Sequence, residues 1–170
     1  MKNLIIGIIT VVVLISCSIS KSVYVNGVRI PDVIPFSKFK GDTAAYLQTN
    51  IENRKAYYIG KEVDVLLKDV EQPIKSFIFT TSRLKIQGKS KINGMNLYFY
   101  DEDKFSKAID TKKFIPSISL DFMSPYMDLD TFALILTKNN NKYWSPEMEM
   151  YIRKQRIEKV QYFDGGIGNK

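Results

Sequence analysis

The pattern of hydrophobic positions divides the chain into an apolar N-terminal run and a body of short mixed segments. Residues 4–15 are almost uninterrupted in their apolar character, and Lys2 precedes them. A helix needs roughly 20 apolar residues to cross a bilayer, so this run is too short to span one. Its length, with a positive charge before it, is typical of a secretory signal peptide.

The first half of the body predicts a hairpin followed by two helices. Residues 23–30 place an Asn-Gly pair between two β-rich segments, which is the strongest short hairpin signal because both turn positions need a positive φ. Asp42 is positioned to cap a helix over 43–53. Apolar residues then recur at helical spacing and predict a second helix over 61–69, which Pro73 ends.

The second half of the body is rich in β-branched and aromatic residues and predicts most of the sheet. Gly88 and the Asn93-Gly94 pair indicate turns between the first three strands, which we expect to form an antiparallel meander. A fourth segment alternates strictly between apolar and polar residues, and a fifth closes the domain. The predicted strands are 74–81, 83–87, 95–100, 118–122 and 157–163.

Two later segments carry helix signals. Residues Leu129–Lys138 can form either a helix or a buried strand, and we favour the helix because Asp128 and Asp130 can cap it and asparagines follow it. Ser145-Pro146-Glu147 combines a capping hydroxyl, proline at the first helical position and an acid in the first turn. It predicts a helix that runs to about Lys154.

These elements predict an α+β fold, with an antiparallel sheet of about five strands packed with three to four short helices. We expect a single domain, which suits the length of the chain after its leader. The predicted divisions are the signal peptide at 1–16, a cysteine and tether at 17–22, the α+β domain at 23–163 and a flexible tail at 164–170.

The end of the leader adds a modification site. Leu14-Ile15-Ser16-Cys17 resembles the lipobox of bacterial lipoproteins, and Cys17 is the only cysteine of the chain. The resemblance implies cleavage before Cys17, lipid modification with fatty acids such as palmitate, and a membrane as partner through that anchor. Ser18 stands where an aspartate often signals retention at the inner membrane. The resemblance therefore favours a cell-envelope protein of the outer membrane that faces the periplasm.

Composition excludes several classes of chemistry. The chain has no histidine, so neither a Ser-His-Asp nor a Cys-His centre can form, and a zinc site of the usual ligand types has no donors once Cys17 is acylated. We expect no cofactor and no metal. The formal charge is +7, but the lysines are spread along the chain without a basic block, which argues against nucleic acid as a partner.

Two groups of residues could carry function in the body. Asp101-Glu102-Asp103, with Asp121, Asp128 and Asp130 later in the chain, could bind calcium or act as acids and bases, but the spacing of a calcium loop is missing. The aromatic residues Tyr57, Tyr58, Tyr143 and Trp144 are the candidate binding surface, because Tyr and Trp often anchor interfaces. They could equally be core residues.

No motif assigns an activity. The segments 57–69 and 73–77 resemble parts of small uncharacterised Gram-negative envelope lipoproteins, a likeness that implies no catalytic site. We expect a non-enzymatic binding or assembly module whose partner is an envelope protein or a glycan. The alternative is a hydrolase that acts on envelope polymers through carboxylates. A cleft with two carboxylates would favour the hydrolase, and an open apolar or aromatic surface would favour the binding module.

The lipobox generates a direct test. We expect Cys17→Ser to abolish incorporation of a labelled fatty acid and to leave an uncleaved or soluble protein, because the thiol is the group that is acylated. Metabolic labelling followed by membrane fractionation measures both effects. Label retained on the Cys17→Ser protein would contradict the anchor.

Overall fold

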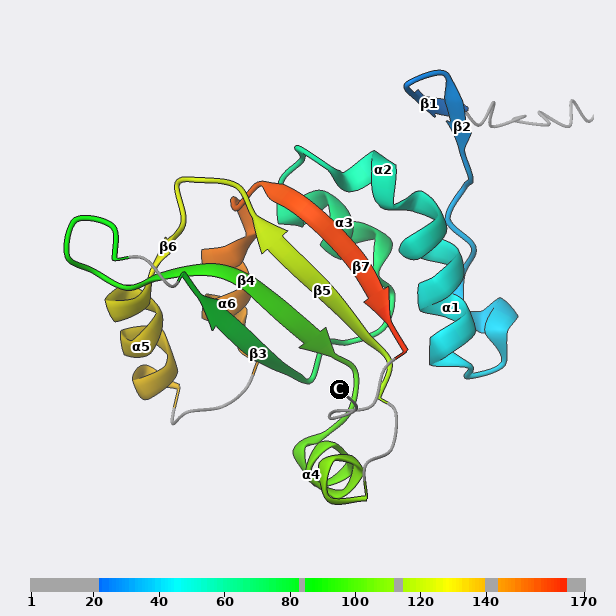
Figure 1. The fold of residues 1–170 in the computed structure, drawn as a ribbon. Helices are drawn as coiled ribbons and strands as arrows, with labels where there is room; N and C mark the ends of the chain where they lie inside the picture. Colours follow the sequence, from blue (N-terminus) through cyan, green and yellow to red (C-terminus); the bar gives the residue numbers. More distant parts are fainter. Residues whose placement is uncertain (1–21, 83–84, 112–114, 140–143, 165–170) are drawn as a thin grey trace, which may run out of the picture.

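The chain folds around a five-stranded antiparallel sheet with helices against one of its faces (Figure 1). The structure, a computed structural model, describes residues 22–82, 85–111, 115–139 and 144–164. The predicted α+β class is therefore confirmed. Cys17 and Tyr143 lie outside the described residues, as do the predicted signal peptide and most of the predicted tail.

The predicted hairpin is present and forms a separate two-stranded sheet. Strand β1 spans Val23–Val25 and strand β2 spans Val28–Ile30. Asn26 and Gly27 adopt φ values of 51° and 78°, which is the left-handed geometry that the Asn-Gly pair predicts. The hairpin projects from one end of the molecule, away from the main sheet (Figure 1).

The main sheet has the strand order β3-β4-β5-β7, and a short strand, β6, also pairs with the start of β4. All neighbouring strands are antiparallel, as predicted, but the meander is β3-β4-β5 and not the predicted set 74–81, 83–87 and 95–100. The strands are β3 (Ser76–Thr81), β4 (Lys91–Tyr98), β5 (Ser117–Phe122), β6 (Met127–Asp128) and β7 (Ile157–Phe163).

The prediction of a strand at 83–87 is wrong for residues 85–87, which are the part of this range that the structure describes. Gln87 and Gly88 form a turn with φ values of 54° and 75°, and Ile86 bridges back to Lys89. The return strand is β4, which begins at Lys91 rather than at Met95. The Asn93-Gly94 pair, read as a turn, therefore lies inside a strand.

The four predicted helices are all present, and two further helices accompany them. The segment Leu129–Lys138 is a helix, as favoured, and the Asp128 side chain accepts a hydrogen bond from the Thr131 amide at its start (3.1 Å). The helices are α1 (Thr43–Asn50), α2 (Lys55–Tyr58), α3 (Val63–Asp69), α4 (Glu102–Asp110), α5 (Leu129–Lys138) and α6 (Pro146–Arg153), with 3-10 turns at Phe36–Phe39 and Glu52–Arg54.

The two unpredicted helices have separate causes. Helix α2 is a single turn that continues from the 3-10 turn after α1, too short to give a periodic pattern. Helix α4 begins in the acidic cluster Asp101-Glu102-Asp103, which lacks the spacing of a calcium loop. Its Phe105 ring packs edge-on against Tyr98, with ring centroids 4.7 Å apart, and so fixes α4 over the end of β4.

Register places most of the buried apolar residues of the main sheet on one face. Leu97 pairs with Ile118, Met95 with Leu120, and Leu120 in turn with Val160; all five are buried. Directly opposed residues share a face of the sheet. Helices α3 and α6 lie behind this inner face in Figure 1, and Tyr46, Leu66, Phe132, Met148 and Ile152 from the helices complete the core.

The opposite face is open over most of its area. It carries the alternate residues, including Asn96, Ser119 and Gln161, which are partly exposed. Helix α4 covers only the end where β4 finishes. Within the described ranges, no helix has both the length and the apolar character that crossing a membrane requires.

Helix α6 starts as its sequence predicts. The Ser145 hydroxyl accepts a hydrogen bond from the Met148 amide at 3.1 Å, and Pro146 occupies the first helical position. Met148 and Ile152 of this helix are buried in the core, so the cap fixes the register of a helix that the sheet depends on.

We expect Ser145→Ala to lower the free energy of unfolding by on the order of 1 kcal/mol, because the Met148 amide loses its acceptor. Ser145→Asp keeps a capping oxygen and should cost clearly less. Denaturant titrations of both variants measure the difference. Equal destabilisation by Ala and Asp would show that the hydroxyl holds something other than the helix end.

Candidate functional site

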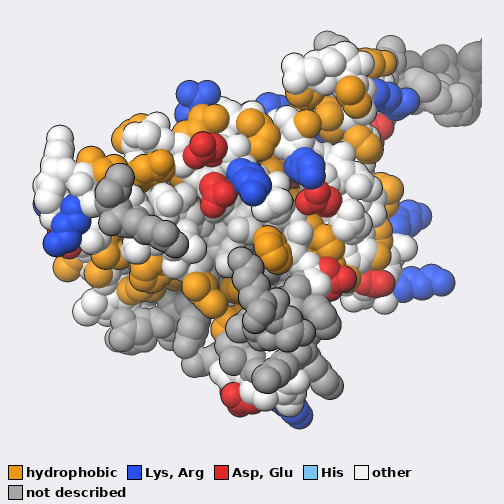
Figure 2. Space-filling model, in the orientation of Figure 1, with side chains coloured by type: hydrophobic (Ala, Val, Ile, Leu, Met, Phe, Trp, Pro, Cys, Tyr) orange, Lys and Arg blue, Asp and Glu red, His pale blue; other side chains and the backbone are white. Residues whose placement is uncertain are grey.

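A polar cavity on the open face of the sheet is the candidate functional site. Its volume is about 420 Å³, within the range of small-molecule sites. Acidic and basic side chains gather on this face over β5 and β7 (Figure 2). The cavity is lined by Asn93, Asp121, Phe122, Tyr126, Glu158 and Lys159.

The first wall of the cavity is a β-bulge in β4. Thr80 of β3 pairs with Gly94, whereas Thr81 pairs with Ile92, so Asn93 is the extra residue. Ile92 and Met95 on either side of the bulge are both buried. Asn93 and Gly94 therefore both belong to the open face, where strict alternation would place only one of them.

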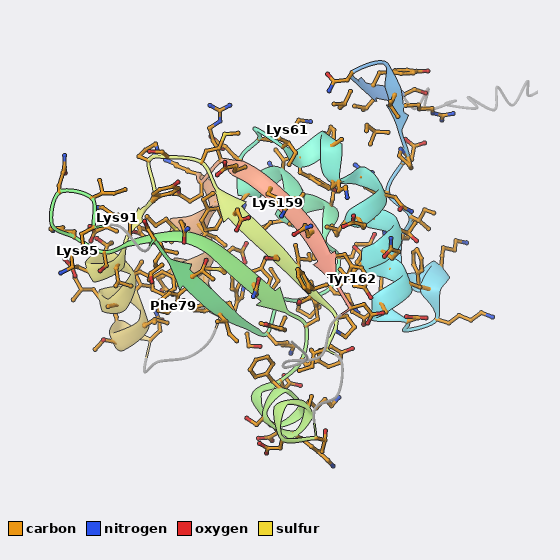
Figure 3. All side chains as sticks on the ribbon, viewed as in Figure 1. Lys61, Phe79, Lys85, Lys91, Lys159 and Tyr162 are labelled. Atoms are coloured by element: carbon orange, nitrogen blue, oxygen red, sulfur yellow. The ribbon has the colours of Figure 1, made fainter. Side chains whose placement is uncertain are left out.

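The second wall is an equivalent bulge in β7. Asp121 of β5 pairs with Lys159, whereas Phe122 pairs with Ile157, so Glu158 is the extra residue. Ile157 and Val160 are buried, while the two charged residues between them are exposed. The bulge thus presents Glu158 and Lys159 together on the open face, and Lys159 is visible there in Figure 3.

The two bulges meet at Asp121. Gly94 lies opposite Asp121 on one side and Lys159 lies opposite it on the other. Two irregularities on different strands, separated by more than sixty residues in sequence, therefore flank one carboxylate. Bulges of this kind commonly re-aim side chains beside functional sites.

Gly94 allows the neighbouring polar groups to approach each other. A Cβ atom at this position would lie 2.6 Å from the Thr80 hydroxyl, 2.7 Å from the Leu120 carbonyl oxygen and 3.1 Å from an Asp121 carboxylate oxygen. No side chain fits in that space without displacing backbone. The absence of a side chain at Gly94 therefore leaves room for the Thr80 and Asp121 side chains to approach each other across β4.

The polar groups of the cavity are left available for a ligand. The Asn93 side-chain oxygen is buried and has no hydrogen-bond partner. Among the described residues, the side chains of Asp121, Glu158 and Lys159 make no hydrogen bond or ion pair. Because this oxygen is closed to solvent, a ligand can reach it only if the Asn93 side chain turns toward the cavity.

The chemistry of the cavity is that of hydrogen-bond and charge recognition. It offers two carboxylates, one amide, one phenol and one ammonium group. Within the parts of the chain that the structure describes, His, Cys, Asp and Glu side chains do not gather in threes as a metal site requires.

The described residues of the predicted aromatic surface do not lie together in the structure. Tyr58 is fully buried, and its hydroxyl donates to Asp69 at 2.9 Å and lies 3.2 Å from the Asn50 carbonyl oxygen. Burial raises the pKa of Tyr58 far above its ordinary value, so the phenol stays neutral. Tyr58 is thus a core residue that presents no surface. Tyr57 is half-buried beneath the Lys61 ammonium, which lies 3.0 Å from the ring centroid.

Trp144 lies at the other edge of the sheet. Its ring packs against Phe77 of β3, and its indole nitrogen donates to Glu149 at 3.2 Å. It lines a smaller cavity of about 170 Å³ with Leu67 and Ile74, among others. Tyr57 and Trp144 therefore belong to opposite edges of the sheet and do not form one surface.

Sequence reasoning named Asp121 among the scattered aspartates but missed the other cavity residues. Two signals were present. The strand 157–163 departs from strict alternation at its two consecutive charged residues, and an Asn-Gly pair falls inside a β-rich segment. Both signals mark bulges only when the partner strand is known.

Comparisons with known proteins add no further assignment. No family model, no curated protein and no solved structure matches this chain. The case for the cavity rests on its geometry.

We expect Gly94→Ala to lower the free energy of unfolding by about 1–3 kcal/mol, the usual cost of overpacking, because the added methyl meets backbone at Leu120. Thermal and denaturant unfolding measure the loss. Ser119→Ala, on the same face of β5, is the matched control and should stay within about 0.5 kcal/mol. If Gly94→Ala were as mild as this control, the close approach of Thr80 and Asp121 would not be needed for the fold.

Proposed function

We propose that the chain is a lipid-anchored protein of the bacterial cell envelope and that its domain is a non-enzymatic binding module. The binding site is the cavity around Asp121. The ligand is a polar compound that carries an amino group, such as an amino sugar of an envelope glycan. The observation that carries the proposal is the pair of bulges that turns unpaired polar groups toward one cavity.

The anchor is supported by the leader alone. The charged start, the short apolar run and Cys17 after Leu14-Ile15-Ser16 resemble a lipoprotein signal. Acylation also gives the only thiol of the chain a role in a compartment where disulfides are the usual fate of cysteine. Mature lipoproteins carry several acyl chains, and more than one chain is needed for stable attachment.

The ligand class follows from the charges of the cavity. Among the charged side chains that line the cavity, Asp121 and Glu158 outnumber Lys159. An ammonium group complements this set, although the chain as a whole is basic. Hydroxyl groups beside the ammonium could donate to the remaining acceptors and accept from Lys159.

A second candidate is the envelope-polymer hydrolase. One observation favours it: Asp121 and Glu158 place two carboxylates in the same cavity, and most glycoside hydrolases act through such a pair. Incubation with purified cell-wall polymer tests it by the release of reducing ends. If the native protein releases reducing ends and Asp121→Asn does not, the domain is an enzyme and not a binding module.

Titration with glucosamine and glucose, followed by amide NMR shifts, tests the binding site. We expect glucosamine to shift the amides of Asn93, Asp121 and Lys159, and glucose to shift them much less. Asp121→Asn should weaken glucosamine binding about tenfold, the effect of losing one charge-assisted hydrogen bond of about 1.5 kcal/mol.

Asp110→Asn is the matched control, because it removes one exposed carboxylate at the end of α4 and leaves the cavity intact. It should bind glucosamine as the native protein does. Equal responses to glucosamine and glucose, or equal effects of the two variants, would overturn the assignment of an amino-bearing ligand to this cavity.

A further inference from the structure

The hairpin β1–β2 is amphipathic. Val23 pairs with Ile30 and Val25 with Val28, so one face of the ribbon carries only aliphatic side chains. The other face pairs Tyr24 with Arg29. Alternation in two three-residue strands therefore separates an apolar face from an aromatic and cationic one.

Much of the apolar face lies in solvent. Val28 at the turn is 66% exposed and Val23 is 40% exposed, whereas Ile30 at the base is buried. Tyr24 on the other face is 62% exposed. A two-stranded hairpin has marginal stability in water by itself, so an apolar ribbon of this kind favours a covering surface.

The base of the hairpin is fixed to the domain and its tip is free. Arg54 donates to the Pro31 carbonyl oxygen at 3.0 Å. Asn50 exchanges two hydrogen bonds of 2.8 Å with the backbone of Ile34. These contacts hold the segment after β2, while the turn points away from the sheet (Figure 1).

The hairpin is also the described element nearest to Cys17. Five residues lie between Cys17 and Val23 in the sequence, and the six Cα–Cα steps that join the two reach at most about 20 Å when extended. An acylated Cys17 lies at the bilayer surface. The hairpin therefore begins within about 20 Å of the bilayer surface, close enough for its apolar face to reach the lipid.

We infer that the hairpin lies in the membrane interface, with its valine face toward the acyl chains and with Tyr24 and Arg29 among the headgroups. This inference rests on the proposed anchor at Cys17. Tyrosine favours the interface because its ring is apolar and its hydroxyl polar. Arginine can pair with lipid phosphate while its stem covers apolar surface. The hairpin then orients the domain, where an anchor alone would leave it free to rotate.

Tryptophan quenching by brominated lipids tests the position of the hairpin. Val28→Trp and Leu134→Trp are prepared as mature acylated proteins in vesicles of phosphatidylethanolamine and phosphatidylglycerol, with and without brominated acyl chains. Leu134 is the matched control, because it is 71% exposed on α5 at the opposite end of the molecule. The native Trp144 gives both proteins the same background.

We expect bromination to reduce the added emission of Val28→Trp to roughly half, with a blue shift, because interfacial segments sit about 5–10 Å into the boundary region. Leu134→Trp should lose no more emission than the native protein. Equal quenching of the two variants in acylated protein would overturn the inference and leave the anchor intact.

The intact mass of the same samples reports acylation separately. A protein without acyl chains would overturn both the anchor and the inference. The soluble Cys17→Ser protein tests a second copy of the chain as the partner. If this protein is a dimer and adding Val28→Asp dissociates it, the valine face binds another copy of the chain. That result would overturn the membrane assignment.

Discussion

Coverage of the sheet on one face only is the constraint on which the rest of the structure depends. The inner face carries Leu97, Ile118 and Leu120 at alternate positions, and the core helices pack against it. Because side chains alternate along a strand, the residues between them point to the outer face, where Asn96, Ser119 and Gln161 are partly exposed. Helix α4 covers one end through Phe105. The remaining area leaves polar side chains open to solvent, and the cavity is found there.

The two bulges show how a regular sheet acquires a site. Without them, β4 and β7 would each contribute one open-face side chain beside Asp121. With them, the two strands bring Asn93 and Glu158 as additional groups while the buried residues on either side keep their places in the core. The cost is local loss of ladder pairing. Both strands that flank Asp121 contain a bulge. Core packing alone does not require this, because strands without bulges would bury the same number of apolar residues.

Local signals in the sequence predicted local structure well and pairing poorly. The caps at Asp42 and Ser145 and the Asn26-Gly27 turn depend on residues within four positions of one another, and each formed as predicted. Asn93-Gly94 has the same composition as the hairpin turn, yet pairing with Asp121 holds it in a strand. In the sequence, nothing distinguishes Tyr58 from a surface aromatic residue. In the fold it is a core residue, because α3 places Asp69 against its hydroxyl. Both outcomes depend on residues distant in the chain, which is why periodicity could not show them.

The contacts of Asn50 and Arg54 have a mechanical consequence. Asn50 is fully buried in α1 and grips the Ile34 backbone through both its amide oxygen and its amide nitrogen, while Arg54 holds Pro31 and is itself paired with Asp69 at 3.0 Å. A pull on the N-terminal end of the chain is therefore transmitted first to these hydrogen bonds and through them to α1 and α3. The strands of the main sheet, which shape the cavity, come later in the chain than these contacts. Tension along the tether can thus peel the segment after the hairpin from the helices before it alters the spacing of the groups around Asp121.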